Sequence, residues 1–211
     1  MKLINITYNS VLRCPLCDSI GVDRAQLSRQ HYFFGEFIIP LPASGVFLRE
    51  CTNCGLLYKS IVPDRMSLVA IMQGAATSVW RKKGGSHPSM DWLLPYLQGK
   101  KRSILDVGAA NGDLLLHMRP MSRVVSALDV VRYPQCQSTI NGEYIIGEIE
   151  DELVWSGEKY EIVTAFDIFE HFLDASSAVS NLSGMMGFEG KLIVETGDWN
   201  YSGDDLGEWY Y

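Results

Sequence analysis

Apolar and polar residues follow different patterns in the two halves of the chain. In the second half, five runs are continuously apolar, as expected for parallel strands that are covered on both faces. These runs predict strands at residues 103–109, 124–130, 143–148, 161–167 and 191–197. Segments such as GDLLLHMR and SSAVSNLSGMM lie between them and place apolar residues at helical spacing. The alternation predicts an α/β domain with a parallel sheet over residues 103–211.

The first half has shorter runs with β character, such as YFFGEFIIPLP and GVFLREC, within residues 1–62. Residues 63–102 have a helical pattern that begins after a turn and is broken by Gly84 and Gly85. We therefore predict three segments: a small β-rich module over 1–62, a helical connector over 63–102, and the α/β domain.

Two CxxC pairs, Cys14 with Cys17 and Cys51 with Cys54, lie in the predicted β-rich module. Each pair places two thiolates on one tight turn, and two such turns supply the four sulfur ligands that structural zinc prefers. The alternatives are two disulfides or free thiols, and disulfides require an oxidising compartment that nothing in the sequence indicates. The pattern predicts a zinc site that stabilises a segment too small for a large core.

Charge is distributed unevenly along the 211 residues. Residues 1–102 hold 13 Lys and Arg against 6 Asp and Glu, whereas the rest holds 5 against 19. The basic half either attracts a phosphate-bearing substrate or nucleic acid, or merely complements the acidic half. The chain has no run of about 18 apolar residues and no signal-peptide pattern, so we expect a cytoplasmic protein without a membrane span.

A glycine-rich turn, LDVGAANGD at residues 105–113, follows the first predicted strand directly. Gly108 and Gly112 permit a sharp turn and close approach of the backbone to a ligand at the carboxyl edge of the sheet. Asp129 ends the second strand, where an acid is able to accept both ribose hydroxyls of an adenosine. The alternative for Asp129 is a helix cap or a surface turn.

Together, LDVGAANGD, ALD and FDIFEH resemble the class I S-adenosylmethionine (SAM)-dependent methyltransferases over residues 103–200. The resemblance implies a Rossmann-like sheet, SAM as cofactor, and methyl transfer. It also implies a loop around the methionine part of SAM, an acid at the ribose, a segment at the adenine edge and a strand end beneath the cofactor. The corresponding residues are Asp106, Gly108, Ala110 and Gly112 in the loop, then Asp129, then Glu148 and Ile149, and finally Asp167. Many members carry Gly where this chain has Ala110.

With the cysteine pairs included, the whole chain resembles bacterial zinc-ribbon methyltransferases of sugar and natural-product pathways. This resemblance implies a small-molecule acceptor, such as a sugar or a nucleotide-linked metabolite. Two alternatives stay open. One is an RNA methyltransferase whose basic zinc module binds nucleic acid, and the other is a non-catalytic scaffold that binds SAM and zinc.

The run Asp167-Ile-Phe-Glu170-His171 follows the fourth predicted strand. If a helix begins there, Asp167, Glu170 and His171 lie on one face, which makes His171 a candidate base with Glu170 beside it. Ubiquinone-biosynthesis O-methyltransferases have a similar run, in some cases with a divalent metal, so the resemblance also implies possible Mg²⁺ binding at these three residues. The alternative is that Glu170 and His171 only brace the loop.

The C-terminus is short for this family. Only 14 residues follow the run KLIVETG, too few for the helix and hairpin that complete a seven-stranded sheet. We therefore expect a truncated or five-stranded form of the fold, and an exposed sheet edge that favours self-association as a homodimer.

Overall fold

The computed structural model describes residues 2–34, 37–75, 90–99, 102–151 and 155–196. The chain folds into two compact units. Among the described residues, 2–75 and 173–175 belong to the first unit, and 90–172 with 176–196 belong to the second. The segment boundaries expected at residues 62 and 102 stay predictions.

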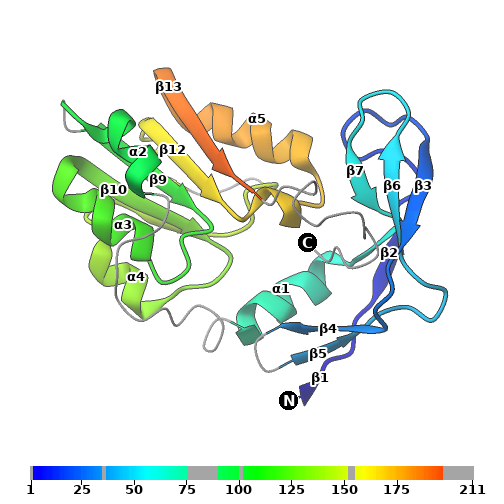
Figure 1. The fold of residues 1–211 in the computed structure, drawn as a ribbon. Coiled ribbons are helices and arrows are strands. Elements are labelled where there is room, and N and C mark those ends of the chain that lie inside the picture. Colours follow the sequence, from blue (N-terminus) through cyan, green and yellow to red (C-terminus); the bar gives the residue numbers. More distant parts are fainter. Residues whose placement is uncertain (1, 35–36, 76–89, 100–101, 152–154, 197–211) are drawn as a thin grey trace. The chain divides into compact units, whose positions relative to one another are not determined.

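The first unit is rich in β-structure, as its short apolar runs predict. Its strands form three small sheets with the orders β1-β5-β4, β2-β8 and β3-β6-β7 (Figure 1). The strands are β1 (Lys2–Leu3), β2 (Tyr8–Ser10), β3 (Gly21–Gln26), β4 (His31–Phe34), β5 (Phe37–Pro40), β6 (Phe47–Cys51), β7 (Leu57–Lys59) and β8 (Ile61–Pro63). Helix α1 (Arg65–Ala75) follows them. The two CxxC turns flank β3 and β6, which pair antiparallel and thereby bring the turns to the same end of one sheet.

The second unit contains a five-stranded parallel sheet with the order β11-β10-β9-β12-β13. Its elements are α2 (Met90–Leu97), β9 (Arg102–Val107), α3 (Asp113–Met118), η1 (Arg119–Met121), β10 (Ser122–Asp129), α4 (Pro134–Thr139), β11 (Tyr144–Ile146), β12 (Tyr160–Phe166), η2 (Phe169–His171), α5 (Ala175–Met185) and β13 (Met186–Glu195). All five predicted strands and the parallel arrangement are confirmed. This Rossmann-like topology places β9 at the centre, where the strand order reverses, and ligands bind such sheets at the carboxyl ends of the strands.

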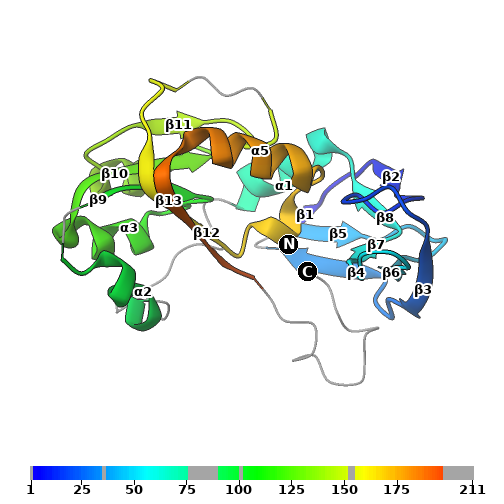
Figure 2. The same ribbon diagram turned by 90° about the horizontal axis from the view of Figure 1, so that it is seen from above.

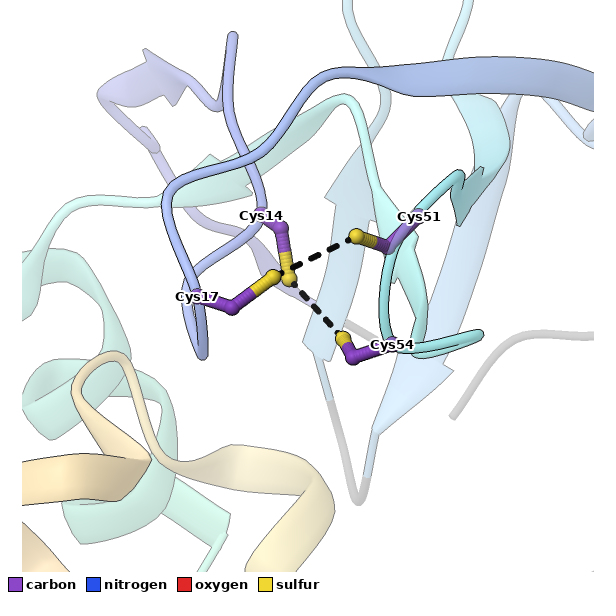
Figure 3. Close-up of side chains that lie close together, drawn as sticks. All are labelled: Cys14, Cys17, Cys51 and Cys54. Carbon is purple, nitrogen blue, oxygen red and sulfur yellow. Dashed lines mark hydrogen bonds between the residues drawn. The ribbon is translucent and has the colours of Figure 1, made fainter.

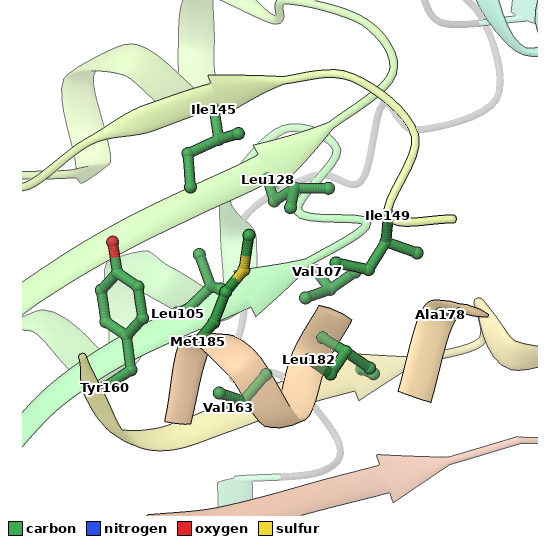
Figure 4. Packing of buried hydrophobic residues seen from close by; sticks show 11 residues of the cluster. Leu105, Val107, Leu128, Ile145, Ile149, Tyr160, Val163, Ala178, Leu182 and Met185 are labelled. Atoms are coloured by element: carbon green, nitrogen blue, oxygen red, sulfur yellow. The ribbon is translucent and has the colours of Figure 1, made fainter. Parts of the chain in front are cut away.

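Helices cover both faces of the sheet, which is why its strands are apolar without alternation. Helix α5 packs on one face, and α2 and α3 lie on the other (Figure 2). The α5 face holds a core in which Ala178, Leu182 and Met185 of α5 contact Leu105 and Val107 of β9 (Figure 4). Because side chains alternate along a strand, Asp106 points to the opposite face, away from this core.

Strand β13 differs from the prediction at its start. The strand was expected at residues 191–197, whereas it begins at Met186 and carries residues 187–190 as an irregularity in its pairing with β12. Glu189 there adopts a left-handed φ of 61°, a bulge conformation. Among the described residues, β13 pairs only with β12, and self-association through its other edge stays a prediction. The expected truncation concerns residues 197–211, which lie outside the described part of the chain.

A search of the described residues finds no helix that is long and apolar enough to cross a membrane.

Candidate functional site

The four cysteines of the first unit converge on one point (Figure 3). Their sulfur atoms all lie within 4.8 Å of one another, and this is the only such group of potential metal ligands among the described residues. The Sγ atoms of Cys14 and Cys54 are 3.6 Å apart, and those of Cys17 and Cys51 are 3.5 Å apart. A disulfide requires about 2.0 Å, whereas a tetrahedral ion at about 2.3 Å from each sulfur separates the sulfurs by about 3.8 Å. The geometry therefore fits a single four-coordinate metal.

The two CxxC turns have the same backbone hydrogen bonds. The amide of Asp18 donates to the Cys14 carbonyl, and the amide of Gly55 donates to the Cys51 carbonyl. In both turns, the residue after the second cysteine has a left-handed φ, 56° at Asp18 and 74° at Gly55. This repeated conformation directs both sulfurs of each pair toward the other pair, and it explains the Gly after the second pair.

Polar groups stabilise the thiolate form of two of the four cysteines, Cys17 and Cys51, whereas burial and the neighbouring cysteines raise the pKa of Cys54 to about 12. Asn53 donates from its backbone amide to Cys51 Sγ at 3.4 Å and from its side chain to Cys17 Sγ at 3.6 Å. Hydrogen bonds from Ser19, with a further one from Asn53, lower the pKa of Cys17 to about 6. Because the thiolate is the form that binds a metal, these contacts favour coordination at neutral pH.

The second candidate site is the glycine-rich loop between β9 and α3. Gly108 and Gly112 have left-handed φ values of 73° and 78°. A Cβ at Gly108 would lie 3.1 Å from the Ile168 side chain, and one at Gly112 would lie 3.0 Å from the Cys136 backbone. Both glycines are therefore needed for conformation and for space, as the sequence predicts.

Ala110 lies in the same loop and has an unusual conformation for alanine, with φ at 45°. The left-handed region costs an L-residue with a Cβ roughly 1–2 kcal/mol. Glycine, which the resemblance implies at this position in many family members, would avoid this strain.

We predict that Ala110→Gly leaves the stability of the second unit unchanged or raises it by up to about 1 kcal/mol, because relief of strain offsets the greater freedom of glycine in the unfolded chain. Ala178→Gly, inside α5, is the matched control and should cost about 1 kcal/mol or more. Urea unfolding followed by tryptophan fluorescence measures both. Equal losses for the two variants would contradict the strain at Ala110.

Asp129 ends β10 and holds the loop directly. Its Oδ2 accepts a hydrogen bond from the Ala110 amide at 2.8 Å, and its Oδ1 accepts one from the Val131 amide at 3.0 Å. The side chain is 7% exposed, and burial raises its pKa to about 6 despite these bonds. Each carboxylate oxygen has further acceptor capacity, so these two bonds do not exhaust the group.

Asp106 lies on β9, two residues before Gly108. It is 4% exposed, and burial raises its pKa to about 7. Thr164 of β12 donates a hydrogen bond to Asp106 Oδ1 at 2.6 Å. Our interpretation of the sequence missed Thr164, although a polar residue inside the apolar run EIVTAFD, in register with Asp106, could have identified it.

The predicted adenine segment follows β11, next to the end of β10. The Gly147 amide donates to the Asp129 carbonyl at 3.0 Å, which ties this segment to the candidate ribose acid. Ile149 is 3% exposed and packs in the α5-side core, whereas Glu148 is only partly buried. The Ile149 carbonyl accepts a hydrogen bond from the Asn181 side chain of α5 at 2.8 Å, so helix α5 holds the segment in place.

The run after β12 differs from the α-helix considered for it. Asp167 has a left-handed φ of 49°, and only one 3₁₀ turn, η2, follows. The α-helical spacing of Asp167, Glu170 and His171 is therefore absent, and the described residues do not bring these three groups together as metal ligands. The geometry does not support the expected Mg²⁺ site. Glu170 instead accepts a hydrogen bond from the Thr196 hydroxyl at 2.9 Å, which ties the loop to the end of β13.

The structure thus brings the glycine loop, Asp106, Asp129 and the segment after β11 together at the carboxyl edge of the sheet. Ile168, on the loop after β12, closes against Gly108 on the other side of β9. His171 lies in η2 on this second loop, with its amide bonded to the Ile168 carbonyl. The glycine loop follows β9, and the loop with His171 follows the neighbouring strand β12. The strand order reverses between these two strands, and such folds bind their ligands at that point.

Comparison with known proteins supports this assignment of the fold. A family model described as a methyltransferase domain matches residues 86–211. Curated relatives include ubiquinone biosynthesis O-methyltransferases from Salmonella paratyphi A, with 28% identity over 47% of this chain and 43% of the relative, and from Erwinia tasmaniensis, with 24% identity over 61% and 59%. The chain spans about half the length of the curated relatives it matches.

Similar solved structures include a SAM-bound amino pentose methyltransferase of calicheamicin biosynthesis from Micromonospora echinaspora. It has 18% identity and a TM-score of 0.46, over 57% of this chain and 54% of that chain. The N-methyltransferase NodS from Bradyrhizobium japonicum has 16% identity and a TM-score of 0.49, over 60% and 71%. The family model covers more than half of the chain, and the chain therefore belongs to the methyltransferase domain family, with the Rossmann-like fold of the class I SAM-dependent methyltransferases.

Proposed function

We propose that the second unit binds SAM at the carboxyl edge of β9 and β10 and transfers its methyl group to a small molecule. The observation that carries this proposal is the convergence of the strained glycine loop with Asp129, which lies within hydrogen-bond distance of the loop amide of Ala110. In this proposal, the loop from Asp106 to Gly112 surrounds the methionine part of SAM. Asp129 accepts the ribose hydroxyls, Glu148 and Ile149 border the adenine, and Asp167 lies beneath the cofactor.

SAM supplies an activated methyl group on a sulfonium, so the protein mainly has to hold the acceptor in line with it. Positioning of this kind contributes up to roughly 7–11 kcal/mol of barrier lowering. An oxygen or carbon acceptor also has to lose a proton, and His171 is the proposed base because it follows β12 at the same sheet edge. Glu170, anchored on Thr196, holds the turn that carries His171.

The acceptor class rests on the relatives. Several are named as O-methyltransferases of ubiquinone biosynthesis, and one similar structure is an amino pentose methyltransferase. We propose a small-molecule acceptor, with a sugar or nucleotide-linked metabolite as the first class to test. The comparisons favour neither an RNA methyltransferase nor a non-catalytic scaffold. Turnover of labelled SAM on a metabolite panel, with a low-salt gel-shift assay for RNA, would distinguish the three; SAM binding without transfer would support the scaffold.

We further propose that the four cysteines of the first unit hold a structural zinc ion. Its support is the repeated turn geometry and sulfur separations close to those of a tetrahedral site. With four protein ligands, such an ion has no open position for a substrate, so its contribution is to folding and not to methyl transfer.

Asp129→Ala is expected to weaken SAM binding about 5- to 150-fold, or about 1–3 kcal/mol, because the ribose hydroxyls and the loop amide both lose their acceptor. Isothermal titration with SAM measures the change. Asp113→Ala, on the same loop at the start of α3, is the control and should retain most of the affinity. Unchanged affinity in Asp129→Ala would refute the ribose assignment.

A further inference from the structure

Thr164 is a fully buried polar residue to which neither the family comparison nor the sequence pattern gives a role. It lies in the middle of β12, directly beside Asp106 of β9 in the parallel register. On the other side of Asp106, the register neighbour is Ala127 of β10, which offers no polar side chain. Thr164 is therefore the hydrogen-bonding side chain that the two flanking strands present to this carboxylate.

The Asp106–Thr164 contact has the character of a bond to an ionised carboxylate. The Oγ1 to Oδ1 distance is 2.6 Å, within the range of O–H···O⁻ hydrogen bonds. The second candidate acceptor for the Thr164 hydroxyl, the Leu105 carbonyl, is 3.5 Å away. If Asp106 were protonated and donated its proton to Thr164, the hydroxyl would have to turn to this distant carbonyl. The arrangement therefore favours a charged Asp106 that accepts from Thr164.

We propose that Thr164 is a positioning residue that keeps Asp106 ionised and oriented for the cationic amino group of the methyl donor. This inference rests on the proposed function, because the amino group that Asp106 would bind belongs to SAM. Oδ1 is fixed by Thr164, which leaves Oδ2 as the oxygen for the ligand. A carboxylate with one oxygen held at a buried strand pair does not have to be reoriented when the donor arrives.

The surroundings of Asp106 explain why such a residue is needed. The pKa of Asp106 is raised to about 7 as the balance of three causes: burial raises it most, the bond from Thr164 lowers it, and the nearby carboxylate of Asp129 raises it. The thiol of Cys136 on α4 also interacts with Asp106. Without Thr164, a larger share of Asp106 would be protonated at neutral pH and unable to bind an ammonium group.

Two substitutions test the proposal in the full chain. Thr164→Val removes only the hydroxyl from a residue of the same shape, and Thr164→Ser restores it. Ser126→Ala is the matched control, because Ser126 of β10 is also fully buried, and its hydroxyl bonds to the Glu143 amide and to Tyr160. The titration of Asp106 is followed by carbon NMR of labelled carboxyl groups, and SAM binding by isothermal titration between pH 6 and 8.

Thr164→Val should raise the pKa of Asp106 by about one unit and weaken SAM binding about fivefold at pH 7, with the difference falling to about twofold at pH 8. Thr164→Ser and Ser126→Ala should stay within about twofold of the unmodified protein. The proposal is overturned if Thr164→Val titrates and binds as the unmodified protein does, or if Ser126→Ala has the same effect. If the unmodified protein fails to bind SAM, the proposed function fails, while the titration of Asp106 still decides whether Thr164 controls its charge.

Discussion

Cys14→Ser is expected to release the bound metal and unfold the CxxC turns, while SAM binding by the second unit is retained. The small core around these turns consists of Cys14, Cys51 and Tyr58, so two of its three buried members are themselves proposed ligands. Little apolar area remains to hold the turns together without the ion. Structural zinc contributes on the order of 10–16 kcal/mol of apparent binding free energy in small zinc domains.

Metal analysis of the purified full chain, limited proteolysis and SAM titration together measure this outcome. Cys136→Ser is the matched control, because Cys136 is a buried thiol of the second unit and has no place in the cysteine cluster. It should keep one zinc per chain. Stoichiometric zinc in Cys14→Ser, or equal loss in Cys136→Ser, would contradict the four-thiolate site.

Asp106→Asn is expected to stabilise the donor-free protein at pH 8 and at the same time to weaken SAM binding. The folded-state pKa of Asp106, about 7, is above its ordinary value of 3.8. Between these values, the folded protein holds a proton that the unfolded chain has released. The proton on Asp106 therefore adds to the free energy of unfolding at low pH, and this contribution is lost as the pH rises toward and through 7. Asparagine does not ionise, so the variant avoids this loss. We expect its free energy of unfolding at pH 8 to exceed that of the unmodified protein by about 1–3 kcal/mol.

The same substitution removes the negative charge that we propose binds the amino group of SAM. We expect SAM affinity to fall about 10- to 100-fold, as is usual for the loss of a hydrogen bond to a charged group. Urea unfolding at pH 5 and pH 8, followed by tryptophan fluorescence, measures the stability change, because Trp92 and Trp155 lie in the second unit. Asp91→Asn, at an exposed position of α2, is the control and should change neither quantity. A variant that is less stable at pH 8 would contradict the raised pKa.

The order of the elements in the second unit could be predicted from the sequence because its strands are buried on both faces. Continuous apolar runs such as SILDV and EIVTAF are typical of strands in a parallel sheet, and few other structures accommodate them. The backbone of the glycine loop was also predictable, since a left-handed turn next to a strand end demands glycine, whereas the ribose role of Asp129 stays a prediction. The geometry of the cysteine cluster agrees with the prediction from spacing alone.

The run after β12 could not be predicted in the same way. Its residue types permit a helix, but whether one forms depends on the left-handed backbone at Asp167 and on the anchoring of Glu170 by Thr196, which lies 26 residues later. Such tertiary contacts have no local signal in the sequence. Thr164 was missed for a related reason, because its importance depends on the strand that lies beside it.

The contact between Ile168 and Gly108 has a consequence for engineering. Substrate preference in a fold of this kind is usually altered by exchanging the segments that follow the strands. Here the segment that begins at Asp167 occupies the space directly above residue 108, so grafting it from another enzyme imports a new neighbour for the donor loop as well. A graft that retains Ile168 preserves this packing, and one that replaces it with a bulkier side chain is expected to change the proposed binding of SAM by the glycine loop together with the choice of acceptor.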